Sequence, residues 1–104
     1  MQMQITARRF NADDALKDYV SKKLSKLKRY YDGITEARVV LSDEGTPGSS
    51  KSAEVIMRVY QQTLSATGNG VTHQMAIDEC VDALRRQLKK YKAKLRSKDK
   101  DYHR

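Results

Sequence analysis

Residues 73–96, HQMAIDECVDALRRQLKKYKAKLR, decide the fold of this chain because one apolar stripe runs through the whole stretch. Apolar side chains recur three or four positions apart, which is the spacing of one face of an α-helix. They are Ile77, Cys80, Val81, Leu84, Leu88, Tyr91 and Leu95. Thr72, just before the stretch, can cap the helix with its hydroxyl. The stretch therefore predicts a long helix over about residues 73–96, whose stripe must be covered by another element.

The residues before this helix predict a shorter helix and four strands. Apolar residues recur at helical spacing from Leu16 to Tyr31, so we expect a helix over about residues 14–31, ended by Gly33. Alternating or β-branched segments predict strands at residues 2–6, 36–42, 53–60 and 63–67, with a mobile loop over 43–51. A tight turn without glycine is expected near Gln61 and Gln62. The run Gly68-Asn69-Gly70 is expected to break the sheet.

The element order β-α-β-β-β-α predicts an α+β fold. Both apolar helical stripes are covered at once when the two helices lie on one face of a four-stranded sheet, which leaves the other face exposed. The length of 104 residues suits one domain. We expect residues 1–96 to form this domain and residues 97–104 to form a short, polar, disordered tail.

Composition indicates an anionic partner. The formal net charge is +8, and a field of that sign attracts polyanions, of which nucleic acid is the commonest. A lone cysteine suits a reducing compartment. The first residues lack the pattern of a signal peptide, and no apolar run approaches the ~20 residues needed to span a bilayer. We therefore expect a cytoplasmic protein, neither exported nor inserted in a membrane.

The positive charge is concentrated on the two predicted helices. Every charged residue from 85 to 98 is basic. On a helix these residues form two rows, one of Arg85, Lys89, Lys92 and Arg96 beside the apolar stripe and one of Arg86, Lys90 and Lys94 further round. The first helix adds Lys17, Lys22, Lys23, Lys26, Lys28 and Arg29. A solvated face that complements the helix dipole would usually mix signs, so the pattern favours contact with phosphates.

Other candidate sites have simpler structural explanations. Cys80 lies on the apolar stripe and is expected to be a small core residue. Asp13 and Asp14 suit a helix cap, and His73 and His103 are too isolated to hold a metal. Tyr19, Tyr31 and Tyr91 lie on apolar stripes and are expected in the core, not as stacking platforms for bases. No nucleophile, base and stabiliser converge, so we expect no enzyme, catalytic residue, metal or cofactor.

Three segments carry a resemblance to a known family. They are residues 11–27 (NADDALKDYVSKKLSKL), residues 31–41 with YDGI and ARVVL, and residues 76–95 with AID and VDALRRQLKKYKAKL. Their order and spacing, over residues 1–96, resemble the short ribosome hibernation promoting factors, also called ribosome-associated inhibitor A. The resemblance implies a fold related to double-stranded RNA binding domains. It also implies a site in the small ribosomal subunit, in the channel where mRNA and tRNA lie.

The implied function is inhibition of translation, which idles ribosomes during stress or stationary phase. The implied partners are the small subunit with its rRNA and the whole ribosome, with no small-molecule substrate, and we expect a monomer off the ribosome. The resemblance and the charge pattern together assign contacts with rRNA to the basic helix residues Lys22, Lys23, Lys26, Lys28, Arg29, Arg85, Arg86, Lys89, Lys90, Lys92, Lys94 and Arg96.

The chain departs from the family pattern in two places. The family commonly starts its second helix with an Asp-Met-Tyr type sequence, whereas this chain has Thr72-His73-Gln74 and a small insertion near Gly70. Any contact that the family's tyrosine makes is therefore not assigned to this chain. We also expect the C-terminal dimerisation domain of the long form to be absent, which leaves open whether ribosome pairing is promoted or prevented. A second hypothesis is a protein-binding regulator, for example of transcription, that docks an acidic partner through the exposed sheet face or a basic helix.

Overall fold

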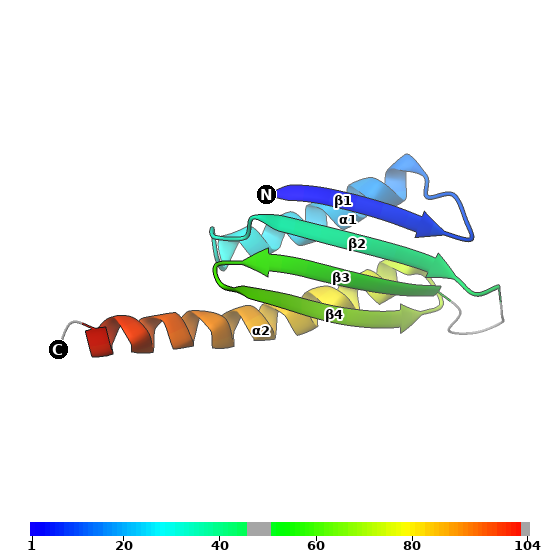
Figure 1. Ribbon diagram of the computed structural model, residues 1–104. Coiled ribbons are helices and arrows are strands. Elements are labelled where there is room, and N and C mark those ends of the chain that lie inside the picture. The colour runs from blue at the N-terminus through cyan, green and yellow to red at the C-terminus, as the bar shows by residue number, and fades with distance from the viewer. Residues whose placement is uncertain (46–50, 103–104) are drawn as a thin grey trace.

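The computed structural model describes residues 1–45 and 51–102, with side chains as far as Leu95 in the last helix. Figure 1 shows the chain order β-α-β-β-β-α, as predicted. The elements are β1 (Gln2–Arg8), α1 (Asp14–Ser25), the short 3-10 helix η1 (Lys26–Arg29), β2 (Glu36–Asp43), β3 (Lys51–Val59), β4 (Gln62–Gly70) and α2 (His73–Tyr102). Of the loop predicted over 43–51, residues 46–50 lie outside the described residues, and its two ends belong to β2 and β3.

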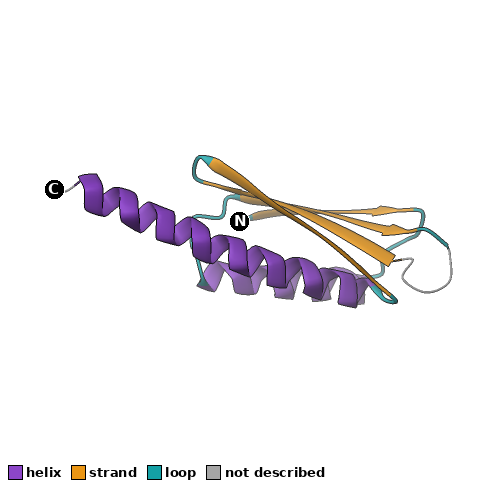
Figure 2. Ribbon diagram, turned by 90° about the horizontal axis from the view of Figure 1, so that it is seen from below, coloured by secondary structure: helices purple, strands orange, loops and turns teal. Residues whose placement is uncertain are grey.

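The four strands form one mixed sheet in the order β1-β2-β3-β4. Strands β1 and β2 are parallel and are connected through α1, whereas β2, β3 and β4 pair antiparallel. Figure 2 shows both helices under one face of the sheet, which confirms the predicted α+β architecture. In Figure 1 both helices start at the same end of the sheet and run toward the other end, where α2 projects past the strands.

The core lies between the sheet and the two helical stripes. Alternate strand residues such as Val39, Val55 and Leu64 point inward and are buried, as the period of a strand requires. They meet helix residues such as Leu24 and Leu84, neither of which is exposed. Burial of each large apolar side chain contributes roughly 1.5–3 kcal/mol. Cys80 is confirmed as a core residue, and burial raises the pKa of its thiol to about 11.

Both helix starts are capped as predicted. The Asp13 carboxylate accepts a hydrogen bond from the Leu16 amide at 2.8 Å, and the Thr72 hydroxyl accepts one from the Met75 amide at 3.1 Å. His73, the first residue of α2, is buried and stacks on Phe10 with ring centroids 4.2 Å apart. Its Nε2 lies 2.9 Å from the Ser42 carbonyl oxygen. His73 therefore fastens the start of α2 to the end of β2 and to the loop after β1.

The first helix is shorter than predicted. Regular α-helix ends at Ser25, and the chain tightens into η1 before Tyr30, whose amide donates to the Leu27 carbonyl oxygen at 3.0 Å. A tightened turn at a helix end is common, and here it keeps both Leu24 and Leu27 fully buried. Helical structure therefore stops before Gly33 is reached.

The second helix is longer than predicted. α2 continues to Tyr102, so the expectation of a disordered tail over residues 97–104 is wrong for residues 97–102, and residues 103–104 lie outside the described part of the chain. Residues 97–102 contain neither glycine nor proline, so no residue in them interrupts the helix.

Gly68 and Gly70 do not break the sheet, contrary to the prediction. Both are inward-facing residues of β4, and both are buried under the first turns of α2. A Cβ at Gly68 would lie 2.2 Å from the Ala76 carbonyl oxygen, and one at Gly70 would lie 2.8 Å from the Met75 Cβ. The missing side chains therefore let α2 pack directly against the backbone of an edge strand.

The hairpin between β3 and β4 turns at Tyr60 and Gln61, one residue earlier than predicted, because Val59 pairs with Gln62. Gln61 has a φ of 59°, in the left-handed region that favours glycine. We expect Gln61→Gly to raise the free energy of unfolding by roughly 1 kcal/mol, since glycine adopts this φ without steric cost. Urea unfolding followed by circular dichroism measures this change in the free energy of unfolding. A destabilised variant would contradict this explanation of the turn.

Candidate nucleic-acid interface

One flank of α2 faces α1. Asp78 of α2 accepts a hydrogen bond from the Tyr19 hydroxyl of α1 at 2.7 Å and lies 3.4 Å from the Lys23 ammonium. Arg85 and Lys89 follow Asp78 at spacings of seven and four residues, so they lie further along the same flank. Lys92, three residues later, continues this row.

Basic residues of the first helical segment lie beside this flank, since the Lys23 ammonium of α1 reaches Asp78. Lys22 of α1 and Lys26, the first residue of η1, are exposed and lie four residues apart, and Lys26 follows Lys23 by three residues. The Tyr31 hydroxyl lies 3.5 Å from the Tyr91 hydroxyl, so the end of the first helical segment reaches the Tyr91 turn of α2. We call this set the interhelical basic surface: Lys22, Lys23, Lys26, Arg85, Lys89 and Lys92.

The Lys23 ammonium already has partners within the protein. Its ammonium pairs with Asp78 and lies 5.5 Å from the centre of the Tyr19 ring. The Asp78 carboxylate raises the pKa of Lys23, and its hydrogen bond raises the pKa of Tyr19. Any phosphate bound by Lys23 would therefore compete with Asp78. Tyr19 is only half-buried, so the prediction that it belongs to the core is wrong for its hydroxyl, which joins the two helices.

The second basic row of α2 faces the other way. Gln87 donates to the Ser65 carbonyl oxygen of β4 at 2.7 Å, and Glu79 accepts from the Asn69 amide at 3.3 Å. The flank that carries these residues therefore lies along edge strand β4. Arg86, Lys90 and Lys94 are exposed on that side, away from α1. The two predicted rows thus exist, but they border different surfaces.

The remaining predicted residues are scattered. Arg29 lines a shallow hollow of about 410 Å³ together with Lys22 and Lys26, so it adjoins the interhelical basic surface. Lys28 lies on the side of β1, where its ammonium lowers the pKa of the Met1 amine. The side chain of Arg96 lies outside the described residues.

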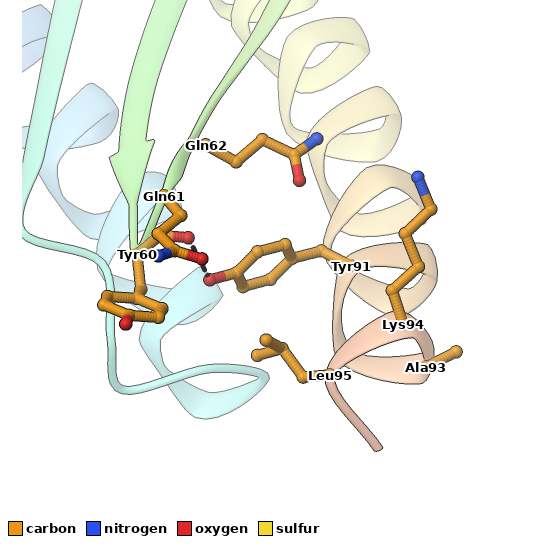
Figure 3. A pocket seen from close by; sticks show the side chains of 7 residues that line it. All are labelled: Tyr60, Gln61, Gln62, Tyr91, Ala93, Lys94 and Leu95. Atoms are coloured by element: carbon orange, nitrogen blue, oxygen red, sulfur yellow. Dashed lines mark hydrogen bonds between the residues drawn. The ribbon is translucent and has the colours of Figure 1, made fainter. Parts of the chain in front are cut away.

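A further hollow was not predicted from the sequence. It measures about 440 Å³ and lies between the β3–β4 hairpin and α2, as Figure 3 shows. Its lining residues are Tyr60, Gln61, Gln62, Tyr91, Ala93, Lys94 and Leu95. The only sequence signal was a tight turn that carries an aromatic residue and no glycine.

Residues 1–45 and 51–102 bring together no cluster of His, Cys, Asp and Glu able to hold a metal ion. Neither described helix is long and apolar enough to cross a bilayer.

A mixed four-stranded sheet covered on one face by two helices, with basic residues where the two helices meet, defines a small α+β domain with a cationic helical face. Comparison with known proteins then gives the family. Residues 3–96 match the family described as Sigma 54 modulation protein / S30EA ribosomal protein, and the chain belongs to this family. The resemblance predicted from the sequence is confirmed.

Several relatives are similar over almost their full length. The ribosome hibernation promoting factor of Escherichia coli K12 is 34% identical over 96 residues, which cover 92% of this chain and 98% of that protein. The factor of the same name from Azotobacter vinelandii is 34% identical, with 90% and 85% covered.

Solved structures agree with the fold. The N-terminal domain of Thermus thermophilus Protein Y superimposes with a TM-score of 0.78 at 34% identity, covering 88% of this chain and 99% of that domain. A ribosomal subunit interface protein from Coxiella burnetii gives a TM-score of 0.80 at 22% identity, covering 89% and 99%, which supports the fold alone.

Proposed function

We propose that this protein is a ribosome-associated inhibitor of translation that binds rRNA of the small subunit through the interhelical basic surface. The observation that carries the proposal is the interhelical basic surface itself, where cations of the two helical segments gather around the Asp78 contact. The names of its relatives, ribosome hibernation promoting factors, supply the partner. The site of action proposed is the channel for mRNA and tRNA, in the cytoplasm.

The chemistry of the interhelical basic surface suits contact with phosphates. Exposed Lys and Arg side chains on two rigid helices can contact successive phosphates, and each contact releases condensed counterions. Such contacts position a protein on RNA without reading its bases. The proposed mechanism is therefore occupation: the bound domain excludes mRNA and tRNA and performs no covalent chemistry.

Binding to small subunits should weaken steeply with salt. If roughly six phosphates are contacted, the logarithm of the association constant should fall against the logarithm of salt concentration with a slope of about −4 to −6. Fluorescence anisotropy of labelled protein with purified subunits, between low and moderate potassium chloride, gives the slope. A slope near zero would contradict binding through phosphates.

Occupation of the channel can be tested by competition. We expect excess protein to displace labelled mRNA and initiator tRNA from purified small subunits in a filter-binding assay, because the ligands would share one site. Simultaneous binding of protein, mRNA and tRNA would place the protein elsewhere on the subunit. That result would refute binding in the channel but would leave association with the ribosome standing.

The family description also names sigma 54 modulation, which favours the protein-binding regulator as a second candidate. In that role the exposed sheet face or a basic helix would dock an acidic partner. The outer face of the sheet mixes signs, since Arg38 pairs with Glu36 at 2.8 Å and Glu54 of β3 is also exposed there. This face carries less excess positive charge than the interhelical basic surface, even when Asp78 and Asp82 are counted there, so it is less suited to an acidic partner.

A further inference from the structure

The hollow beside the β3–β4 hairpin is bordered by a defined contact. Tyr91 of α2 is buried and donates its hydroxyl to the Tyr60 carbonyl oxygen at 2.6 Å, as the dashed line in Figure 3 marks. The Tyr31 ring packs edge-on against Tyr91, with ring centroids 5.2 Å apart. The backbone of the hairpin tip is therefore hydrogen-bonded to α2. The Tyr60 side chain takes no part in this hydrogen bond.

The Tyr60 side chain is 64% exposed, the most exposed of the large hydrophobic side chains in the described residues. The same hollow is lined by Gln61, Gln62 and the half-buried Leu95, and Lys94 lines its other side, across Tyr91 from Tyr60 in Figure 3. An aromatic ring offers a stacking face, amides offer paired donors and acceptors, and an ammonium offers a partner for phosphate. This combination suits a nucleotide taken out of its stack.

The turn holds Tyr60 in place at a conformational cost. Gln61 occupies the left-handed region although glycine would do so without strain. Non-glycine residues in this region are concentrated at ligand-binding sites, where the surrounding structure pre-organises them. Here the strained residue carries an amide that lines the hollow, and glycine would remove that amide.

We propose that this hollow receives one unstacked nucleobase of the rRNA, stacked on Tyr60, with a phosphate of the same strand at Lys94 on the other side of the hollow. This inference rests on the proposed function and deepens it. The hollow adjoins the second row, Arg86, Lys90 and Lys94, so that row would guide the strand toward it along β4. A base contact here would add to the phosphate contacts of the interhelical basic surface.

A single tryptophan can report the stacking directly, because the chain contains none. In Tyr60→Trp, we expect purified small subunits to quench the tryptophan emission, whereas inorganic polyphosphate, which has phosphates but no bases, should leave it unchanged. Val71→Trp is the matched control, since Val71 is also exposed but follows the other end of β4. Its emission should not change with either probe.

Affinity gives the second measurement. Tyr60→Ala should weaken binding to small subunits roughly 5- to 150-fold, the range for loss of one base–aromatic stack, while Tyr60→Phe should stay within about twofold. Circular dichroism should be unchanged in both, because the side chain is exposed. Full affinity of Tyr60→Ala overturns this inference and leaves the proposed function standing. Unquenched tryptophan emission from a Tyr60→Trp protein that still co-sediments with subunits also overturns this inference and leaves the proposed function standing. Failure of the wild-type protein to co-sediment overturns both.

Discussion

Replacement of Arg85, Lys89 and Lys92 by glutamate is expected to weaken association with small ribosomal subunits by about 100-fold or more. The three substitutions remove the α2 cations of the interhelical basic surface and place negative charges where phosphates would lie. The circular dichroism spectrum should not change, since Arg85 and Lys89 are exposed and Lys92 is only half-buried. Co-sedimentation over a range of protein concentrations measures the loss.

The matched control reverses the same amount of charge on the opposite face of the molecule. Arg8, Arg38 and Arg58 are exposed on the outer face of the sheet. Their replacement by glutamate should reduce binding far less than the helix variant does. Equal losses in both variants would mean that net charge and not the interhelical basic surface governs binding. A loss confined to the sheet variant would mean that the outer face of the sheet, and not the interhelical basic surface, contacts the subunit.

The largest expected effect on stability comes from Gly68→Ala. The added Cβ would meet the Ala76 carbonyl oxygen, a backbone atom that can give way only if α2 moves off the strand. Overpacking of this kind should cost about 2 to 3 kcal/mol and lower the thermal midpoint by roughly 10–20 °C. Differential scanning calorimetry of the purified variant tests this.

Asn69→Ala is the control for the glycine substitution. Asn69 lies between Gly68 and Gly70 on the same strand, but it points outward and is exposed. Its replacement should shift the midpoint by only a few degrees, since substitutions on the surface usually change stability little. If Gly68→Ala were equally mild, the close approach of α2 to β4 would not be a requirement of the fold.

The features that could be predicted from the sequence are those with a local cause. The stripe from Ile77 to Leu95 has helical period, so its burial against the sheet followed directly. Asp13 and Thr72 cap helices because their side chains reach amides three residues ahead. Cys80 belongs to the core because it lies on the stripe. The order of the elements also followed from these local patterns, and the family resemblance added the expected partner.

The features that could not be predicted depend on residues far apart in the chain. Gly68 appeared to end a strand because its neighbour in space, Ala76, belongs to another element. The division of the α2 cations between two surfaces depends on the Tyr19–Asp78 contact, which joins positions 59 residues apart. The hollow beside Tyr60 exists only because α2 runs past the hairpin, which no local pattern indicated.

The central claim is that the protein associates with the small subunit and thereby stops translation. The most direct test is sedimentation of tagged protein with purified ribosomes through a sucrose gradient, with a cell-free translation assay on the same sample. We expect the protein to migrate with small subunits and whole ribosomes and to inhibit translation, and the Arg85, Lys89 and Lys92 variant to do neither. Wild-type protein that stays at the top of the gradient while translation proceeds would contradict the account.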